Sequence, residues 1–298
     1  MNKPKILVIL GQTATGKSDL AVDSAKTFHG EIISADSRQV YKGLNIGSGK
    51  ITKKEMKKVP HHLLDVLSPK RTFSVSQFQK KSTKIIKDIF KKDKLPIICG
   101  GTGFYIQSIV DDLSIPTVKE NKELRKKLEK WKTEKLFETL EKLDPERAQS
   151  IDRNNRVRLI RAIEIVKSIG KVPKIRKSSP YDVLQIGLEW PDNILKKRIK
   201  DRLLKRIKSG MIKEVKDLHK NGLSWKRMEQ LGLEYRYVSL FLQNKISKEE
   251  MIEKLNTEIW HYAKRQKTWF KKDKRIKWFS PKEVRKIEKE IKGFLLSN

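Results

Sequence analysis

A stretch near the start of the chain has the residues of a phosphate-binding loop. Gly11-Gln12-Thr13-Ala14-Thr15-Gly16-Lys17-Ser18 matches the pattern G-x-x-x-x-G-K-[ST]. In such a loop, glycines let backbone N–H groups converge on an anion, Lys17 adds a positive charge, and Ser18 offers a hydroxyl to Mg²⁺. The sequence therefore predicts a polyphosphate ligand with Mg²⁺ as cofactor. By motif alone the loop is also typical of ATP-binding proteins.

The elements on either side of the loop fit this interpretation. The apolar run 6–10 predicts a buried strand, and Leu20, Ala21, Ser24, Ala25 and Phe28 recur with the period of a helix. A phosphate-binding loop joins such a strand to such a helix.

Two further strands should bring polar residues to the same place. Residues 31–34 and 95–99 have strand patterns, and they lead into Asp36 and into the glycine-rich turn 100–105. In parallel α/β sheets, ligands bind beyond the carboxyl ends of the strands. Asp36 is therefore a candidate catalytic carboxylate, although a role as a helix or turn cap is equally compatible with its local sequence.

The strand patterns stop near Ser114 and return near residue 183, and charged helical patterns fill the interval. We therefore predict an α/β fold: a P-loop-type parallel sheet core flanked by helices, with an inserted all-helical domain and a helical C-terminal region. The expected boundaries are 1–113 and 181–298 for the two parts of the core, and 114–180 for the insertion.

The charge of the chain points to a polyanionic partner. There are 69 Lys and Arg residues against 36 Asp and Glu, a formal net charge of +33. Nucleic acid is the first candidate, and a lysine-rich composition with solvated surfaces is the alternative. The run 260–270 interleaves cations with aromatic residues, which suits RNA. Of these aromatics, Trp260 and Trp269 are expected in the core.

Compartment and assembly follow from simpler features. No apolar stretch approaches the roughly 20 residues of a membrane span, and the N-terminus shows no signal-peptide pattern. The single cysteine, Cys99, excludes an intramolecular disulfide framework. We expect a cytoplasmic protein that does not engage a membrane and acts as a monomer.

These residues suit displacement at a centre that bears a phosphate or diphosphate, with a carboxylate accepting the proton of the nucleophile. A small-molecule kinase would use this set of groups, and so would a transferase whose leaving group is diphosphate. Composition and spacing do not separate the two. A non-catalytic RNA-binding protein is a third possibility, against which the intact Lys17, Ser18 and Asp36 argue.

The sequence resembles the tRNA dimethylallyltransferases, also called tRNA isopentenyltransferases. The resemblance covers nearly the whole chain, and four motifs in the family's order carry it: 11–18, 36–41, 100–105 and 263–269. It implies transfer of a dimethylallyl group from dimethylallyl diphosphate to the exocyclic amine of adenosine 37 of tRNA. Diphosphate is released.

The resemblance also implies roles for individual residues. The loop would hold diphosphate rather than ATP, with Mg²⁺ at Ser18, and Arg202 would bind the same diphosphate. Asp36 would be the general base, and Thr102 would help to position the reacting centre. The contacts with tRNA would come from Asp36, Ser37, Arg38, Gln39 and Thr102, together with Arg125, Arg158 and Arg161 of the insertion.

Two departures from the family limit the assignment of these roles. Gln12 stands where the family usually has proline, which affects the stiffness of the loop but leaves its phosphate-binding positions intact. Gly232-Leu233 stands where family members often have Gly-Tyr, and Glu234-Tyr235-Arg236 follows. No tRNA contact is therefore assigned to 232–236.

Overall fold

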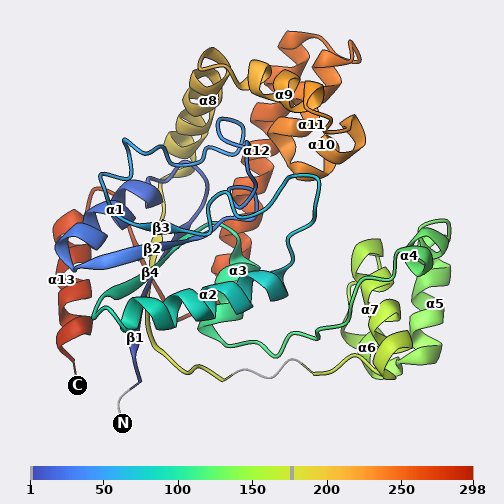
Figure 1. The fold of residues 1–298 in the computed structure, drawn as a ribbon, viewed down its shortest axis with the longest axis horizontal. Coiled ribbons are helices and arrows are strands. Elements are labelled where there is room, and N and C mark those ends of the chain that lie inside the picture. The colour runs from blue at the N-terminus through green and yellow to red at the C-terminus, as the bar shows by residue number, and fades with distance from the viewer. Residues whose placement is uncertain (1–2, 175–177, 298) are drawn as a thin grey trace. The chain divides into compact units, whose positions relative to one another are not determined.

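A parallel sheet organises the chain. The structure is a computed structural model that describes residues 3–174 and 178–297. The 6-stranded sheet has the order β3-β2-β4-β1-β5-β6, and every neighbouring pair is parallel (Figure 1). The strands are β1 (Lys5–Gly11), β2 (Gly30–Ala35), β3 (His61–His62), β4 (Leu95–Gly100), β5 (Asp182–Leu188) and β6 (Ile276–Phe279).

The central strand β1 has apolar side chains on both faces, so helices must cover both. Ile6, Val8 and Leu10 belong to one core, and Leu7 and Ile9 to another. This alternation follows from the period of two in a strand. The larger core contains α2 (Val75–Phe90), α3 (Gly103–Val110) and α8 (Asp192–Lys208), and the smaller contains α1 (Lys17–Thr27) and α13 (Val284–Leu296).

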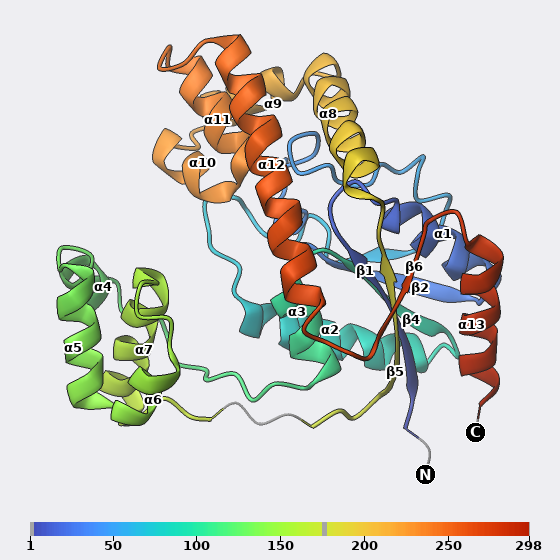
Figure 2. The same cartoon turned by 180° about the vertical axis from the view of Figure 1, so that it is seen from behind.

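Four more helices extend the larger core: α9 (Met211–Lys220), α10 (Trp225–Leu231), α11 (Leu233–Leu242) and α12 (Lys248–Phe270). Ser247 begins α12 with a capping box, in which its side chain and that of Glu250 each accept a hydrogen bond from the other residue's backbone N–H. Figure 2 shows α12 running from α9–α11 back to α3. One long helix thus connects the outer helices with the sheet.

The chain divides into two compact units. The first consists of Met1–Asp111 and Ser179–Asn298, and the second is Asp112–Ser178. The second unit contains α4 (Lys122–Leu128), α5 (Thr133–Leu143), α6 (Pro145–Ser150) and α7 (Arg156–Ile169). Its core includes Leu136, Leu140, Leu159 and Ile163, all fully buried. The amphipathic patterns of the insertion are therefore satisfied within the unit itself.

The structure bears out the predicted fold class and differs in detail. Strand β6 adds an edge to the sheet in a region expected to be helical. Trp260 is partly buried against the larger core, but the core position expected for Trp269 is wrong because this side chain is 37% exposed. Its indole instead covers the backbone of Gly103, where an added Cβ would lie 2.2 Å from Trp269 Cδ1.

Candidate active site

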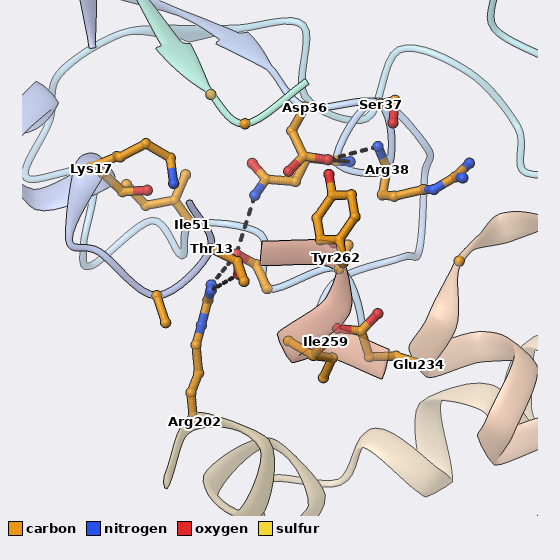
Figure 3. Close-up of a pocket in the computed structure, with 18 of the residues that line it drawn as sticks. Thr13, Lys17, Asp36, Ser37, Arg38, Ile51, Arg202, Glu234, Ile259 and Tyr262 are labelled. Carbon is orange, nitrogen blue, oxygen red and sulfur yellow. Dashed lines mark hydrogen bonds between the residues drawn. The ribbon is translucent and has the colours of Figure 1, made fainter. Parts of the chain in front are cut away.

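Three loops meet at the carboxyl edge of the sheet. Strand β4 lies between β2 and β1, so the loops that follow these strands are neighbours. They border a cavity of about 790 Å³ within the first unit (Figure 3). Of the predicted site residues, those that line it are Thr13, Ala14, Thr15, Gly16, Lys17, Ser18, Asp36, Ser37, Arg38, Gln39 and Arg202. The parallel topology thus brings together residues far apart in sequence.

The loop after β1 has the backbone of an anion-binding turn. Gly11 and Gly16 have φ values of +141° and +96°, and a Cβ at Gly11 would lie 2.5 Å from the Leu188 carbonyl oxygen. Only glycine fits such a position without strain. Thr15 Oγ1 donates to the carbonyl of Gln12 at 2.9 Å, which closes the loop on itself.

Lys17 extends across this loop from the first position of α1. Its Nζ donates to the carbonyl oxygen of Gln12. Burial lowers the pKa of Lys17 to about 8; nearby Arg202 adds to the shift, whereas Asp36 opposes it. A bound anion would favour the charged form of this lysine.

Two glutamines join the loop to α12, one from the loop (Gln12) and one from the helix (Gln266). Gln12 is fully buried, and its Nε2 donates to the Ala263 carbonyl at 3.1 Å. Gln266 Oε1 accepts from the Thr13 N–H at 2.8 Å, and its Nε2 donates to the Gly101 carbonyl at 2.9 Å. The side chain of Gln12 therefore anchors the loop at the position where the family usually has proline.

Arginines of α8 form a second positive wall. Arg202 Nη1 donates to Thr13 Oγ1 at 3.1 Å, and Arg198 Nε donates to the Ala14 carbonyl at 2.8 Å. Arg206 pairs with Glu234 at 3.1 Å. Burial, followed by the repulsion of Arg206, lowers the pKa of Arg202 to about 10. The spacing of four residues places all three on one face, and the structure turns that face to the cavity.

Asp36 has the structural role that its sequence allowed and is also available to a ligand. Its Oδ1 accepts from the backbone N–H groups of Arg38 at 2.8 Å and Gln39 at 3.3 Å. Thr102 Oγ1 accepts from the Ser37 N–H at 3.0 Å. Thr102 thus holds the Asp36 turn, although it does not itself line the cavity. In Figure 3 the Tyr262 ring extends toward this turn.

The three arginines of the second unit that were predicted to contact tRNA have different environments. Arg125 Nη2 pairs with Glu164 at 2.8 Å, and Arg161 pairs with the same carboxylate. The Glu164 side chain is only 1% exposed. Arg158 is exposed on α7. Arg125 and Arg161 therefore support the helical unit, and Arg158 is the one of the three whose side chain is exposed and without an ion pair to Glu164.

Several residues of the cavity wall were not anticipated from the sequence. The segment 43–58 has glycines and lysines but little apolar periodicity, and its residues Ser48, Gly49 and Glu55 line the cavity. Tyr262 and Gln266 also line it, and both lie in or beside the motif 263–269. The motif 263–269 could have indicated that Tyr262 and Gln266 lie at the site, whereas the segment 43–58 has too little periodicity to indicate that it lines the cavity.

Metal ligands of protein origin are sparse at this site. Across residues 3–174 and 178–297, no group of three or more His, Cys, Asp or Glu side chains could hold a metal ion. Ser18 is exposed on the cavity wall, with Asp19 beside it. This arrangement fits Mg²⁺, which keeps several waters and is commonly held by one or two protein groups plus substrate phosphates.

The fold and the cavity define an α/β protein in which a glycine-rich loop with Lys17 faces an arginine-bearing helix and a carboxylate. Residues 39–273 match the IPP transferase family model. The chain belongs to this family, the tRNA dimethylallyltransferases.

Among residues 3–174 and 178–297, none of the helices has the length and apolar character of a membrane span.

Relatives and solved structures agree with this assignment. The chain is 42% identical over 287 residues to the tRNA dimethylallyltransferase of Caldanaerobacter subterraneus subsp. tengcongensis, covering 92% of this chain and 91% of the relative. It is 44% identical over 277 residues to tRNA dimethylallyltransferase 2 of Treponema denticola, covering 91% and 93%.

Two solved structures extend the similarity to the fold. The tRNA isopentenylpyrophosphate transferase of Bacillus halodurans has a TM-score of 0.75 and 34% identity, with 99% of this chain and 97% of that chain covered. A eukaryotic dimethylallyltransferase described as acting on tRNA has a TM-score of 0.80 and 28% identity, with coverage of 93% and 74%.

Proposed function

We propose that this protein transfers a dimethylallyl group from dimethylallyl diphosphate to the exocyclic amine of adenosine 37 in tRNA, releasing diphosphate. One observation carries the proposal beyond family membership. The cationic loop 13–18 and the carboxylate of Asp36 line the same cavity, so a leaving anion and a nucleophile can occupy it together. Because the cavity lies within one unit of one chain, we propose that the enzyme works as a monomer.

The proposed reaction assigns a task to each wall of the cavity. The amine nitrogen forms a bond to the allylic carbon as the bond from that carbon to the diphosphate oxygen breaks. The diphosphate keeps the electron pair, and its charge is stabilised by Lys17, Arg202 and the backbone N–H groups of the loop. Asp36, which lines the cavity, accepts the proton that the amine loses.

Magnesium is part of the proposal because the donor set fits it. Ser18 would contribute a hydroxyl ligand, and the diphosphate and water would complete the shell. When bound, Mg²⁺ neutralises charge that develops on the leaving diphosphate. Removing divalent cations with a chelator should therefore reduce transfer, and adding Mg²⁺ should restore it.

Recognition of tRNA requires the target base to leave the stacked anticodon loop, because a stacked base cannot reach a buried electrophile. We propose that the segment Asp36–Gln39, which Thr102 holds through the Ser37 N–H, grips the extruded adenosine. Further contacts are proposed for Arg125, Arg158 and Arg161. With a net charge of +33, phosphate contacts should make tRNA affinity fall steeply with salt.

The proposal is tested by incubation with labelled dimethylallyl diphosphate and unmodified tRNA, followed by nucleoside analysis. We expect the label on adenosine 37 of the tRNA. A tRNA with guanosine at that position is the matched control and should remain unlabelled. Phosphate transfer from ATP to a small acceptor, without prenylation of tRNA, would instead identify a kinase.

A further inference from the structure

A half-buried acid, Glu214, fastens the loop that follows Tyr41. The carboxylate of Glu214, on α9, accepts hydrogen bonds from three consecutive backbone N–H groups: Asn45 at 3.0 Å, Ile46 at 2.7 Å and Gly47 at 3.0 Å. Hydrogen bonds to a charged acceptor are stronger than neutral ones. The turn 45–47 is therefore tied to a helix far away in sequence.

Tyr235, on α11, completes this attachment. Its hydroxyl donates to Glu214 Oε1 at 2.9 Å and accepts from the Ser48 N–H at 3.1 Å. The side chain is 1% exposed, and a Cβ at Gly47 would lie 2.8 Å from Tyr235 Cζ. Burial and the neighbouring Glu214 raise the pKa of Tyr235 well above its usual value, so the hydroxyl stays protonated.

The attached segment in turn supports the arginines of α8. The Gly49 carbonyl accepts from Arg202 Nη2 at 3.5 Å and from Gln39 Nε2 at 3.3 Å. The Gly47 carbonyl accepts from Arg206 Nη1 at 3.5 Å. A Cβ at Gly49 would lie 1.5 Å from Arg206 Nη2, so the guanidinium groups lie directly against this backbone.

We propose that Glu214 and Tyr235 are positioning residues that fix the segment 45–49 against Arg202 and so set the affinity for the diphosphate group. The inference rests on the proposed function, in which Arg202 binds diphosphate. It also gives a role to Tyr235 within 232–236, where the sequence departs from its family. Neither residue donates to the diphosphate itself; both act through the backbone of the segment.

The test measures binding of inorganic diphosphate to the full-length protein by calorimetry, for the wild type and for Tyr235→Phe and Glu214→Gln. Tyr41→Phe is the matched control, because Tyr41 is also buried and accepts a backbone hydrogen bond, from Phe73 N–H at 3.0 Å. Both test variants should bind diphosphate about tenfold more weakly, the effect of losing one net hydrogen bond. The diphosphate affinity of Tyr41→Phe should stay within about twofold of that of the wild type, because this variant loses no hydrogen bond to the segment 45–49.

Steady-state kinetics add a readout that a purely structural role would not move. The KM for dimethylallyl diphosphate should rise in both variants, while the KM for tRNA stays unchanged. Equal diphosphate affinity in the wild type and both variants would overturn this inference alone. Failure of the wild type to bind diphosphate would overturn the proposed function. If Tyr235→Phe does not fold, the diphosphate affinity of Glu214→Gln decides whether the inference holds. If both Tyr235→Phe and Glu214→Gln fail to fold while Tyr41→Phe folds, a positioning role is contradicted.

Discussion

Gln266 accepts a hydrogen bond of 2.8 Å from the backbone N–H of Thr13, and the other end of the same amide donates to the Gly101 carbonyl. One side chain of α12 therefore joins the loop after β1 to the loop after β4. Gln266 is 6% exposed, so its amide lies within the protein between the two loops. The relative placement of the two glycine-rich loops depends on this residue.

Gln266→Glu should lower the free energy of unfolding by about 1–3 kcal/mol, because the Gly101 carbonyl would lose its donor and face a carboxylate. Chemical denaturation measures this change. Gln243→Glu is the control, since Gln243 also donates to a backbone carbonyl, that of Ser239, but away from the cavity. Equal losses in the two variants would show that Gln266 has no special place in the site.

Replacing Asp36 separates its two roles. Asp36→Asn keeps an oxygen for the N–H groups of Arg38 and Gln39 but cannot act as a base, so transfer should fall by roughly 10²–10⁴ with tRNA affinity within a few-fold. Asp36→Ala should lose the turn as well. Single-turnover rates and tRNA binding measure the two effects. If Asp36→Asn retains full activity, Asp36 is only a turn residue.

Diphosphate binding should weaken as pH rises through about 8, where Lys17 of the free protein loses its proton. The sign follows from burial, which lowers the pKa and leaves a neutral amine above it. Titration of diphosphate itself is removed by comparison with Lys17→Arg, which stays charged throughout. The ratio of wild-type to Lys17→Arg affinity should therefore fall between pH 7 and 9, as expected for a titrating group with a pKa of about 8. A constant ratio would show that Lys17 does not titrate there.

Replacing two arginines of the insertion should affect stability to different extents. Arg125→Ala removes a partner of the buried Glu164 and should destabilise the protein by about 1–3 kcal/mol. Arg158→Ala should change stability by less than about 0.5 kcal/mol, because this side chain is exposed.

Arg158 also tests contact with tRNA. Arg158→Ala should weaken tRNA binding and reduce the slope of log affinity against log salt by about 1, as loss of one phosphate contact does. Thermal unfolding measures the stability of the variants, and filter binding at several salt concentrations measures the tRNA affinity and its dependence on salt. An unchanged slope would remove Arg158 from the tRNA interface.

Short-range patterns account for the parts of the fold that the sequence predicted. The apolar run before Gly11 and the helix period after Ser18 are set by neighbouring residues, and the structure has both of them. Parallel pairing then requires the loops after β1, β2 and β4 to share an edge, which is why Asp36 could be placed beside the phosphate-binding loop.

Contacts between distant segments account for what was missed. The segment 43–58 has no periodicity, and its place in the cavity wall depends on Glu214 and Tyr235 from helices that follow much later. The strand β6 is short and at the sheet edge, so its four residues carry little pattern. The pairing of Arg161 with Glu164, three residues apart on α7, was a local signal that spacing could have supplied.

The central claim is that the loop 11–18 holds a leaving diphosphate in an alkyl transfer. The most direct measurement counts diphosphate released and dimethylallyl adenosine formed in one reaction without ATP. We predict one diphosphate for each modified adenosine, with both products suppressed together by Lys17→Met. Modification that requires ATP hydrolysis, or diphosphate release without modified adenosine, would contradict the account.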